Sequence, residues 1–472
     1  MMDNIVGLRF PFGSIEKGSK VVLYGAGNSG IEFYKVNKEL NWCEIVAVLD
    51  KNYKEVAFPI EVKNPQSIMN LCDYDRVFLS NESRTNRLEI AKQLYSYGVN
   101  PDDIVDWEYN YYAREFIVDY YPTFIRSGNE NKARICVAIS GGLGDFVINL
   151  SFITAIREKY ANTEIDVVVI GLSLELVREL YYMQAINLIK HAHCIDDFRN
   201  RREYHAVFFL NGFNYQLLRY DANSISQIDD NMSSDFNMIF EYQQDNPFFF
   251  IPVELRNAIT LKKAKLFNWN RYTAYNVNGI FDVSCENVKI HINGNFSDIR
   301  NKYALSSNYL TFHYGAGGAT KDNVQTKMWP KEYYRELIRL LKKDFPYIML
   351  VQVCGDNYEK IDGADRYIVK ENINVVKHVL SKAVLHFDCE GGLTHLASQL
   401  KTKCCVVYGP TPSWFLGYKE NINMDPVICG DCKNTCVDWA WKCSKYSRPE
   451  CMYSIKPQMV LERISEYLHL FE

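Results

Sequence analysis

The chain has 472 residues, which is too long for a single hydrophobic core and predicts two or three domains. Hydrophobic residues make up 47% of it and charged residues 23%, which excludes a disordered protein, and the formal net charge of -4 gives no sign of a nucleic-acid partner. The opening residues lack the pattern of a secretion signal, and no uncharged apolar run reaches the ~18 residues that span a bilayer. We therefore expect a cytoplasmic protein.

Residues 1–112 form the first predicted domain, in which strands and helices alternate as βαβαβ, half of a doubly wound nucleotide-binding fold. Its first strand runs into "GAGNSG", and the spacing of Gly25, Gly27, Gly30 and Asp50 matches a dinucleotide fingerprint with a ribose-binding acid. The unit is similar to the small Rossmann-like domains attached to sugar-modifying enzymes. Half a fold cannot enclose a whole dinucleotide, so NAD is not expected. Some of the similar domains hold a nucleotide sugar, and an inert or assembly role is the alternative.

Residues 113–132 are predicted to be a connector, and residues 133–308 a second domain. "ARICVAIS" predicts a strand, "GGLGD" a turn and "FVINLSFITAIREKY" a helix, and further strands and helices follow in alternation. This order predicts a parallel sheet. Residues 227–308 are less regular, with Asn-rich and aromatic segments, and the sequence alone does not order their elements.

Residues 309–472 are predicted to be a third domain, again of alternating strands and helices. "YLTFHYGAGG" predicts a strand and a glycine turn, Pro330 opens a helix, and "LHFDC", "GLTHLASQL" and "KCCVVYGP" predict strand, helix and strand. Twin α/β domains leave a cleft at the carboxyl ends of their strands, where ligands of such folds bind.

"CEGGLTHLA" places two glycines between a strand and a helix near the end of the third domain. Gly391 and Gly392 let the backbone approach a ligand closely, and a helix beginning near Leu393 points unpaired N–H groups and its positive end at the turn. A diphosphate suits that site, with Glu390 on a sugar hydroxyl. The alternative is an ordinary turn in which Thr394 caps the helix.

Two other glycine loops carry charged side chains. Asp145 follows Gly144 at the entrance of a predicted helix, where it serves as a helix-capping acid or as a general base in the cleft. Lys321 and Lys327 lie in "HYGAGGATKDNVQTKMWP". A lysine on such a loop offers a positive charge to a leaving group, and a solvated surface lysine is the alternative.

Together these stretches resemble glycosyltransferase family 9, the bacterial heptosyltransferase family. The resemblance covers about residues 134–472, through the "GD" helix entrance, a K-x-W-P element at Lys327, the "EGGLTHLA" element and a G-P-T turn at Gly409. It implies a GT-B fold and an inverting, metal-independent sugar transfer from a nucleotide diphosphate sugar. Asp145 is implied as the base and Lys327 as the cation that neutralises the departing diphosphate. The donor-binding residues implied are Gly144, Asp356, Glu390, Gly391, Gly392, Leu393, Thr394 and His395.

The family's usual acid before the glycines is Asp, and this chain has Glu390, whose extra methylene moves the carboxylate by ~1.5 Å. ADP-heptose is therefore not assumed as the donor, although the resemblance implies a heptose or a related sugar. The resemblance implies lipopolysaccharide biosynthesis or protein glycosylation, with a bacterial surface glycan or a protein hydroxyl as acceptor. It leaves open a homo-oligomer and a peripheral contact at the cytoplasmic face of the inner membrane. The alternatives are an NAD-dependent oxidoreductase and a non-catalytic scaffold that binds glycans or metals.

Five of the 14 cysteines crowd into residues 429–451. The spacing fits a tetrahedral thiolate site for Zn or Fe, because a C-x2-C pair is followed by further cysteines within one loop. Some members of the resembled family are similar in carrying a cysteine-bound metal in this region. With Cys436 as the spare thiol, the predicted ligands are Cys429, Cys432, Cys443 and Cys451, and a reduced cysteine-rich loop is the alternative.

Two shorter patterns favour ordinary surface or strand positions. "DYD" at Asp73 and Asp75 precedes a predicted strand in the first domain, where a solvated loop is the better interpretation than a metal-binding DxD motif. His191 and His193 would face one side of a strand, and the sequence offers no third ligand nearby.

Overall fold

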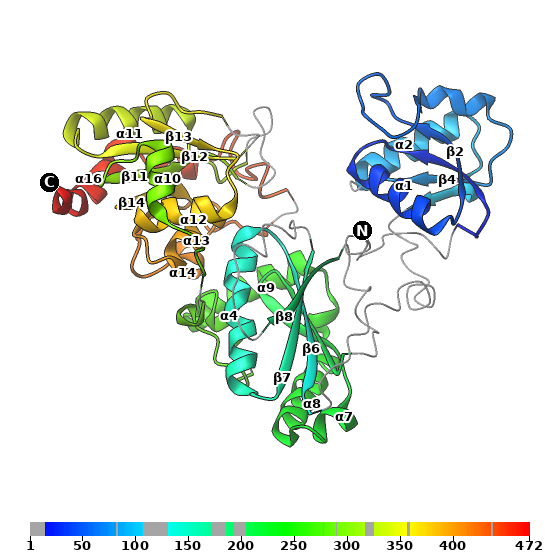
Figure 1. Cartoon of the computed structure of the whole chain (residues 1–472), viewed down its shortest axis with the longest axis horizontal. Helices are drawn as coiled ribbons and strands as arrows, with labels where there is room; N and C mark the ends of the chain where they lie inside the picture. Colours follow the sequence, from blue (N-terminus) through cyan, green and yellow to red (C-terminus); the bar gives the residue numbers. More distant parts are fainter. Residues whose placement is uncertain are drawn as a thin grey trace. The chain divides into compact units, whose positions relative to one another are not determined.

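A computed structural model describes residues 15–81, 84–106, 131–170, 186–192, 204–276, 278–288, 290–316, 325–355, 359–435 and 438–472. The chain divides into two compact units (Figure 1). One comprises residues 1–127 with 192–201, and the other residues 128–191 with 202–472. No helix within the described ranges is both long enough and apolar enough to cross a bilayer.

The first unit is a five-stranded parallel sheet in the order β3-β2-β1-β4-β5. Its strands are β1 (Lys20–Tyr24), β2 (Glu44–Leu49), β3 (Val62–Lys63), β4 (Arg76–Leu79) and β5 (Ile104–Asp106), and its helices are α1 (Asn28–Leu40) and α2 (Arg84–Ser96). The predicted strands correspond to β1, β2 and β4, and the short strands β3 and β5 extend the sheet at its two edges. Apolar side chains cover both faces of the sheet, as a parallel sheet requires.

The second unit contains two lobes, each built on its own sheet. The sheet of the N-terminal lobe has the order β10-β9-β6-β7-β8. Its strands are β6 (Ala133–Ser140), β7 (Thr163–Ile170), β8 (Ile186–Ala192), β9 (Ala206–Asn211) and β10 (Asn214–Tyr220). Its helices are α4 (Leu143–Lys159), α7 (Ala222–Ser226), α8 (Asp230–Gln244) and α9 (Val253–Phe267).

The N-terminal lobe departs from the predicted parallel sheet at one edge. β6 pairs in parallel with β7 and β9, but β10 turns back through Gly212, at a φ of 66°, and runs antiparallel to β9. Helices α8 and α9 also occupy the stretch after residue 227, whose elements the sequence alone did not order.

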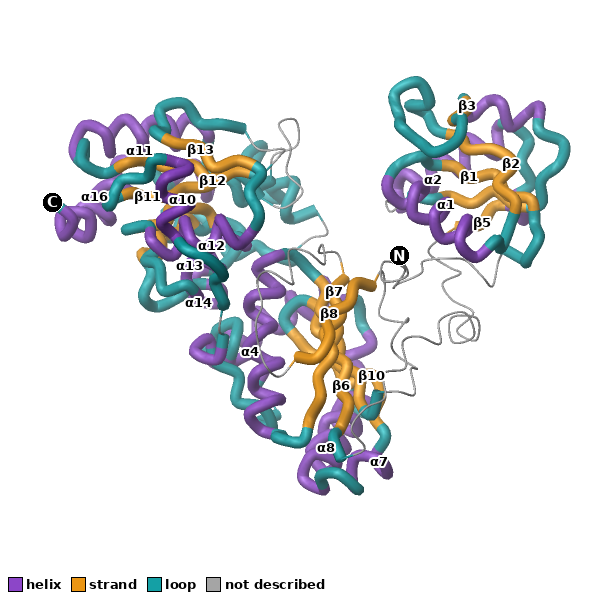
Figure 2. Tube along the Cα trace, viewed as in Figure 1, coloured by secondary structure: helices purple, strands orange, loops and turns teal. Residues whose placement is uncertain are grey.

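The C-terminal lobe has a six-stranded parallel sheet in the order β13-β12-β11-β14-β15-β16. Its strands are β11 (Tyr309–His313), β12 (Met349–Cys354), β13 (Arg366–Val369), β14 (Leu385–Cys389), β15 (Cys404–Val407) and β16 (Ile422–Met424). Its helices are α11 (Lys331–Asp344), α12 (Ile373–Lys382), α13 (Gly392–Gln399), α14 (Ser413–Leu416), α15 (Glu450–Ser454) and α16 (Pro457–Leu468). One apolar cluster joins α11 and α16 to one face of the sheet, and α12 and α13 pack on the other (Figure 2).

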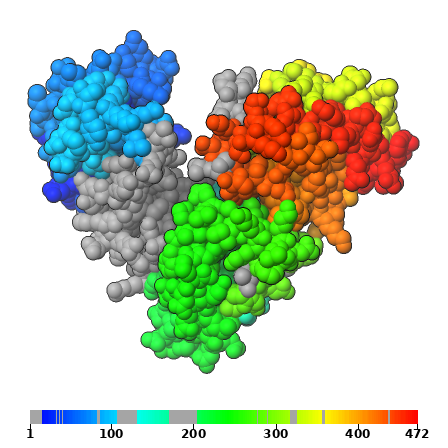
Figure 3. Space-filling view, turned by 180° about the vertical axis from the view of Figure 1, so that it is seen from behind, coloured from blue at the N-terminus to red at the C-terminus, as the bar shows by residue number. Residues whose placement is uncertain are grey.

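The two lobes share one continuous core, because buried residues of α4 and β6 and of α12 and α13 belong to a single apolar cluster. In the space-filling view the orange surface of the C-terminal lobe adjoins the green surface of the N-terminal lobe (Figure 3). Two Rossmann-like sheets joined in this way confirm the predicted GT-B fold class.

The helix α10 (Phe296–Tyr303) lies before the predicted boundary at residue 308 but contacts α12 of the C-terminal lobe. Lys377 Nζ donates to the His291 carbonyl at 2.6 Å, and Arg366 Nε donates to the Tyr303 carbonyl at 3.0 Å. We therefore propose that the C-terminal lobe begins near His291.

Candidate active site

A cavity of about 380 Å³ lies between the two lobes, where strands of both sheets end. The loops that follow β6, β11, β12 and β14 all contribute to its walls, as expected for the ligand edge of parallel sheets. We call this cavity the cleft. Its walls contain many of the predicted site residues, namely Gly144, Asp145, Lys327, Glu390, Gly391, Gly392, Leu393 and His395.

The helices α4 and α13 begin on opposite sides of the cleft and approach each other closely. A Cβ atom on Gly144 would meet the His395 ring at 2.7 Å, and one on Gly392 would meet the Leu143 Cβ at 2.8 Å. Only glycine therefore fits at both positions. The N-terminal ends of two helices, with their unpaired N–H groups, thus meet in one crevice. Both ends carry partial positive charge, which favours the binding of an anion there.

Asp145 lies in the first turn of α4 and lines the cleft. Its Oδ2 accepts a hydrogen bond from the Gly142 N–H at 3.0 Å, so the side chain also caps the helix. Gly141 has a φ of 133°, and a Cβ there would lie 2.5 Å from that same carboxylate oxygen. The glycine loop therefore holds the carboxylate at the mouth of the helix while leaving it in the cleft.

Lys327 reaches the cleft from the loop that precedes α11. Trp329, two residues later, is 1% exposed, and its indole N–H donates to the Ile455 carbonyl at 2.9 Å. Pro330 then stands at the start of α11. The K-x-W-P element thus anchors the loop with a buried indole, and the ammonium of Lys327 lies 3.9 Å from Glu390 Oε2.

Glu390 is 6% exposed and follows β14. Burial raises the pKa of its carboxyl, but the charge of Lys327, a hydrogen bond from His395 and the charge of Lys433 outweigh burial and hold that pKa well below its usual value. Within the described residues Oε2 accepts no hydrogen bond, although it is buried. The carboxylate therefore keeps one oxygen for a ligand in the cleft.

Glu390 should make stability depend on pH. Because its folded pKa is depressed, its contribution is complete above the unfolded value near 4.5 and is lost as pH falls below that value. We expect Glu390→Gln to destabilise the protein by about 1–3 kcal/mol at pH 7. The difference from wild type should shrink by about 1.4 kcal/mol per pH unit below 4.5, measured by urea unfolding at several pH values.

The matched control is Glu336→Gln, because Glu336 forms an exposed pair with Arg339 on α11. Its effect should stay near zero at every pH. A Glu390→Gln difference that does not change between pH 6 and pH 3.5 would contradict the assignment of a charged, buried Glu390.

A chain of hydrogen bonds leads from Glu390 into the interface of the lobes. His395 Nε2 lies 3.3 Å from Glu390 Oε1, and its Nδ1 lies 3.0 Å from the Tyr418 hydroxyl. Tyr418 contacts the Tyr272 hydroxyl of the N-terminal lobe at 2.8 Å. Burial raises the pKa of Tyr418, so its hydroxyl stays protonated. His395, predicted as a donor-binding residue, thus also orients Glu390.

Thr394 has a buried side chain, and its hydroxyl donates to the Cys389 carbonyl at 3.0 Å. The bond ties the first turn of α13 to the end of β14. Any contribution of Thr394 to donor binding would therefore come from its backbone N–H.

Three further cleft residues were missed from the sequence. Lys433 lines the cleft beside Glu390, and burial lowers the pKa of its ammonium while Glu390 opposes that effect. His313 ends β11 and lies 3.3 Å from Asp388, whose pKa is lowered by His313 and His386 against the opposing effect of burial. His313 and Asp388 could have been found as polar residues near the ends of predicted strands. Lys433 lies in the cysteine-rich segment, where no sequence pattern marked it as a cleft residue.

The four predicted metal ligands are close enough for their charges to interact. Burial first, and then the charge of Cys429, raises the pKa of Cys451 to about 12, and Cys432 and Cys443 act in the same direction. Within the described part of the chain, no three His, Cys, Asp or Glu side chains are arranged as ligands of one ion. The thiols share a neighbourhood with the right donor chemistry, but they do not converge. The spare thiol, Cys436, lies outside the described residues.

In the first unit, the predicted nucleotide loop has the geometry of a tight turn. Gly25 has a φ of 115°, and a Cβ on Gly30 would lie 1.9 Å from the Gly25 carbonyl oxygen. Asp50 Oδ2 accepts the Ala26 N–H at 2.8 Å. Gly27 is the N-cap of α1. The structure therefore brings the loop glycines and Asp50 together. One oxygen of the Asp50 carboxylate already accepts a hydrogen bond from the loop backbone.

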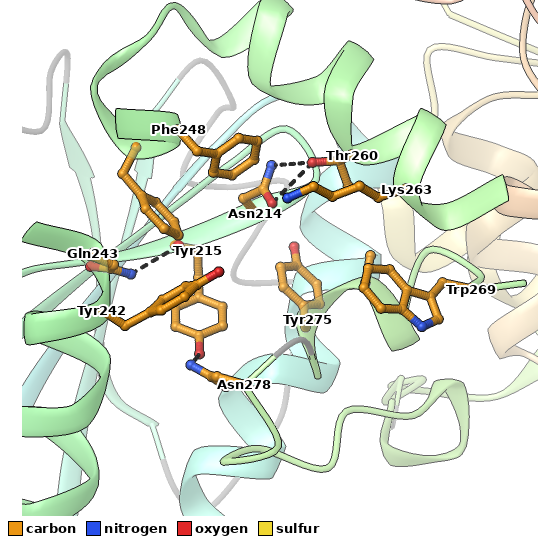
Figure 4. Close-up of a pocket in the computed structure, with 12 residues that line it drawn as sticks. Asn214, Tyr215, Tyr242, Gln243, Phe248, Thr260, Lys263, Trp269, Tyr275 and Asn278 are labelled. Carbon is orange, nitrogen blue, oxygen red and sulfur yellow. Dashed lines mark hydrogen bonds between the residues drawn. The ribbon is translucent and has the colours of Figure 1, made fainter. Parts of the chain in front are cut away.

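A smaller pocket lies within the N-terminal lobe, between β10, α8 and α9 (Figure 4). It measures about 50 Å³ and is lined mainly by aromatic rings. Several of its polar groups pair with one another: Asn214 donates to Thr260 at 3.0 Å, and Asn278 donates to Tyr215 at 2.6 Å. No carboxylate lines it. The chemistry of a transfer reaction therefore points to the cleft.

Some predicted residues lie elsewhere. Asp356, Lys321 and His193 lie outside the described residues, as does the side chain of His191. Asp73 pairs with Lys20, and Asp75 Oδ2 accepts the Lys20 N–H at 2.7 Å. The "DYD" motif therefore occupies an exposed edge of the first unit, far in sequence from the cleft.

Comparison with known families identifies the C-terminal lobe. The sequence model of glycosyltransferase family 9 (heptosyltransferase) matches residues 291–437. The match to family 9 therefore concerns this segment of the C-terminal lobe. The matched segment includes Lys327, Glu390 and Lys433, whereas Asp145 lies outside it, so the assignment of Asp145 rests on its place in the cleft. No curated protein matches the chain.

Solved structures with similar folds include members of family 9. The Escherichia coli ADP-heptose LPS heptosyltransferase II is 16% identical, with 72% of this chain and 99% of that chain covered and a TM-score of 0.44. A family 9 glycosyl transferase from Veillonella parvula is 13% identical, covering 73% and 100%, with a TM-score of 0.42. The iron-containing dodecameric glycosyltransferase TibC from enterotoxigenic E. coli is 13% identical, covering 72% and 78%, with a TM-score of 0.45.

Proposed function

We propose that the family 9 protein is an inverting glycosyltransferase that uses a nucleotide diphosphate sugar. The observation that supports this most directly is that Asp145, Lys327 and the first turn of α13 line the same cleft. A carboxylate on one lobe thereby faces a cation and a helix start on the other. This is the arrangement that a single displacement at a sugar phosphate requires.

In this proposal the acceptor hydroxyl binds beside Asp145, which takes its proton as the new bond to the anomeric carbon forms. The bond between that carbon and the phosphate oxygen breaks with its electron pair going to the diphosphate. The N–H groups at Gly391 to Thr394 and the ammonium of Lys327 receive the developing negative charge. Because one displacement occurs, the configuration at the anomeric carbon inverts.

Glu390 is proposed to accept a hydrogen bond from a hydroxyl of the donor sugar, since one of its oxygens has no hydrogen-bond partner among the described residues. The match to the heptosyltransferase family supports a heptose or a related sugar as the sugar that is transferred. The acceptor is proposed to be a bacterial surface glycan, as in lipopolysaccharide biosynthesis, or a protein hydroxyl. The protein would work in the cytoplasm, at the inner membrane if the acceptor is a lipid-linked glycan.

The test is a binding panel of ADP-, GDP- and UDP-sugars and NAD, followed by mass spectrometry of the product made from the donor that binds. We expect one nucleotide sugar to bind and NAD to bind weakly or not at all. Binding of NAD alone would favour the oxidoreductase that the first unit suggested. The anomeric configuration of the product, determined by NMR, tests inversion.

We also propose that Cys429, Cys432, Cys443 and Cys451 hold a structural Zn or Fe ion, because four thiolates in one short loop are suited to either. The ion would fix the loop, and no step of the transfer passes through it. We expect about one metal ion per chain in protein purified under reducing conditions, measured by inductively coupled plasma mass spectrometry, and loss of the ion in Cys443→Ser. Less than about 0.2 ion per chain would contradict the site.

A further inference from the structure

Lys433 brings a second ammonium group to the cleft, from the loop that contains the cysteines (residues 429–451). Its Nζ lies 4.8 Å from the centre of the Trp439 ring and 5.5 Å from the centre of the Phe213 ring. Among the described residues, none forms a hydrogen bond or an ion pair with this ammonium. Two aromatic rings contact the ammonium group. Because rings compensate a buried charge only in part, the ammonium is suited to bind an anionic ligand in the cleft.

The backbone around Lys433 is fixed to the body of the protein. Its N–H donates to the Pro410 carbonyl at 2.8 Å, and the Asp431 N–H donates to the Gly409 carbonyl at 3.1 Å. The Asp431 carboxylate accepts the Trp414 indole N–H at 2.9 Å. Lys433 therefore projects from an ordered turn beside the G-P-T element, and its ammonium is not a freely moving surface charge.

The same loop also holds the segment that carries Lys327. The Thr326 N–H donates to the Ala440 carbonyl at 2.8 Å, and its hydroxyl donates to the Trp439 carbonyl at 2.7 Å. Trp439 thus contacts Lys433 through its ring and Thr326 through its backbone. One short segment sets the positions of both cations.

Lys327 has a carboxylate, Glu390, at 3.9 Å, whereas none of the described carboxylates lies within ion-pair distance of Lys433. We propose that Lys433 binds the diphosphate of the donor together with Lys327, and that the cysteine-containing loop serves as an active-site element that sets the spacing of the two cations. This inference rests on the proposed function, and it names a donor-binding residue outside the motifs that led to that function.

The experiment is calorimetric titration of wild type and variants with ADP, GDP and UDP, and then with the monophosphate of whichever nucleotide binds best. We expect Lys433→Ala to weaken binding of the diphosphate by about tenfold or more and binding of the monophosphate much less. Lys433→Arg should recover most of the affinity. Lys442→Ala, an exposed lysine of the same loop, is the matched control and should bind as wild type does.

The outcomes separate this inference from the proposed function. If wild type binds none of the nucleotides, the proposed donor class is wrong. If wild type binds and Lys433→Ala binds equally well, only the role of Lys433 is overturned. Equal weakening of monophosphate and diphosphate binding, at an unchanged melting temperature, would also overturn it, because a contact to the second phosphate must distinguish the two ligands.

Discussion

Asp145→Asn is expected to lower turnover by about 10²- to 10⁴-fold while nucleotide affinity stays within about twofold of wild type, because a positioned general base contributes on this scale. The amide oxygen of asparagine can still accept the Gly142 N–H, so the cap of α4 survives the change. Only the ability to take a proton is removed. The measurement is initial rate with the acceptor that supports wild-type turnover, together with calorimetric titration of the nucleoside diphosphate.

Asp230→Asn is the matched control, because Asp230 is an exposed acid in the first turn of α8 in the same lobe. It should leave both the rate and the affinity unchanged. Turnover of Asp145→Asn within about threefold of wild type would show that another group takes the proton, and the proposed mechanism would then lose its base.

Lys327→Met should lower kcat by about 10²- to 10³-fold, since it removes a cation aimed at the charge that develops on the leaving diphosphate. The change also deprives the buried Glu390 carboxylate of its nearest cation, so the variant should be less stable as well. Rate and stability must therefore be separated.

The double variant Lys327→Met/Glu390→Gln separates them. We expect it to recover most of the lost unfolding free energy, because no unpaired carboxylate remains, while turnover stays low. Lys342→Met is the control, since Lys342 lies in the last turn of α11 and forms an exposed ion pair with Asp365. Recovery of turnover in the double variant would mean that Lys327 acts only through stability.

Much of the C-terminal lobe could be predicted because its signals are local. Pro330 marks the start of α11, and the glycine pair before α13 is required where Gly392 approaches Leu143. Buried parallel strands appear as largely apolar runs, so β11 and β15 were visible in the sequence. Asp145 was given two alternatives, a cap and a cleft carboxylate, and its side chain occupies both positions.

The helix α9 could not be predicted because polar side chains interrupt its buried face. Arg256, Asn257 and Thr260 are among its buried residues, and Asn257 accepts the Phe213 N–H at 2.9 Å. Apolar periodicity therefore fails there. The edge strand β10 was missed because it follows a tight turn at Gly212 within a stretch of mixed polarity.

Contacts between lobes were also beyond the sequence. Tyr272 and Tyr418 are separated by 146 positions, and no local pattern pairs them. Lys433 lines the cleft because its loop forms backbone hydrogen bonds with Pro410 and Thr326, which are far from it in sequence or carry no pattern that predicts the contact. Such residues are set by tertiary packing, which a single sequence does not display.

The meeting of α4 and α13 end to end has a consequence for the timing of the reaction. Each helix presents its positive pole to the crevice, and the Asp145 carboxylate masks the pole of α4 while it is ionised. In the proposed transfer, Asp145 loses its negative charge when it accepts the proton, at the same time as the departing diphosphate gains its full charge. The nucleoside diphosphate product should then bind more tightly than the substrate did. Release of this product, together with loss of the proton from Asp145 to water, should therefore limit the rate of each cycle.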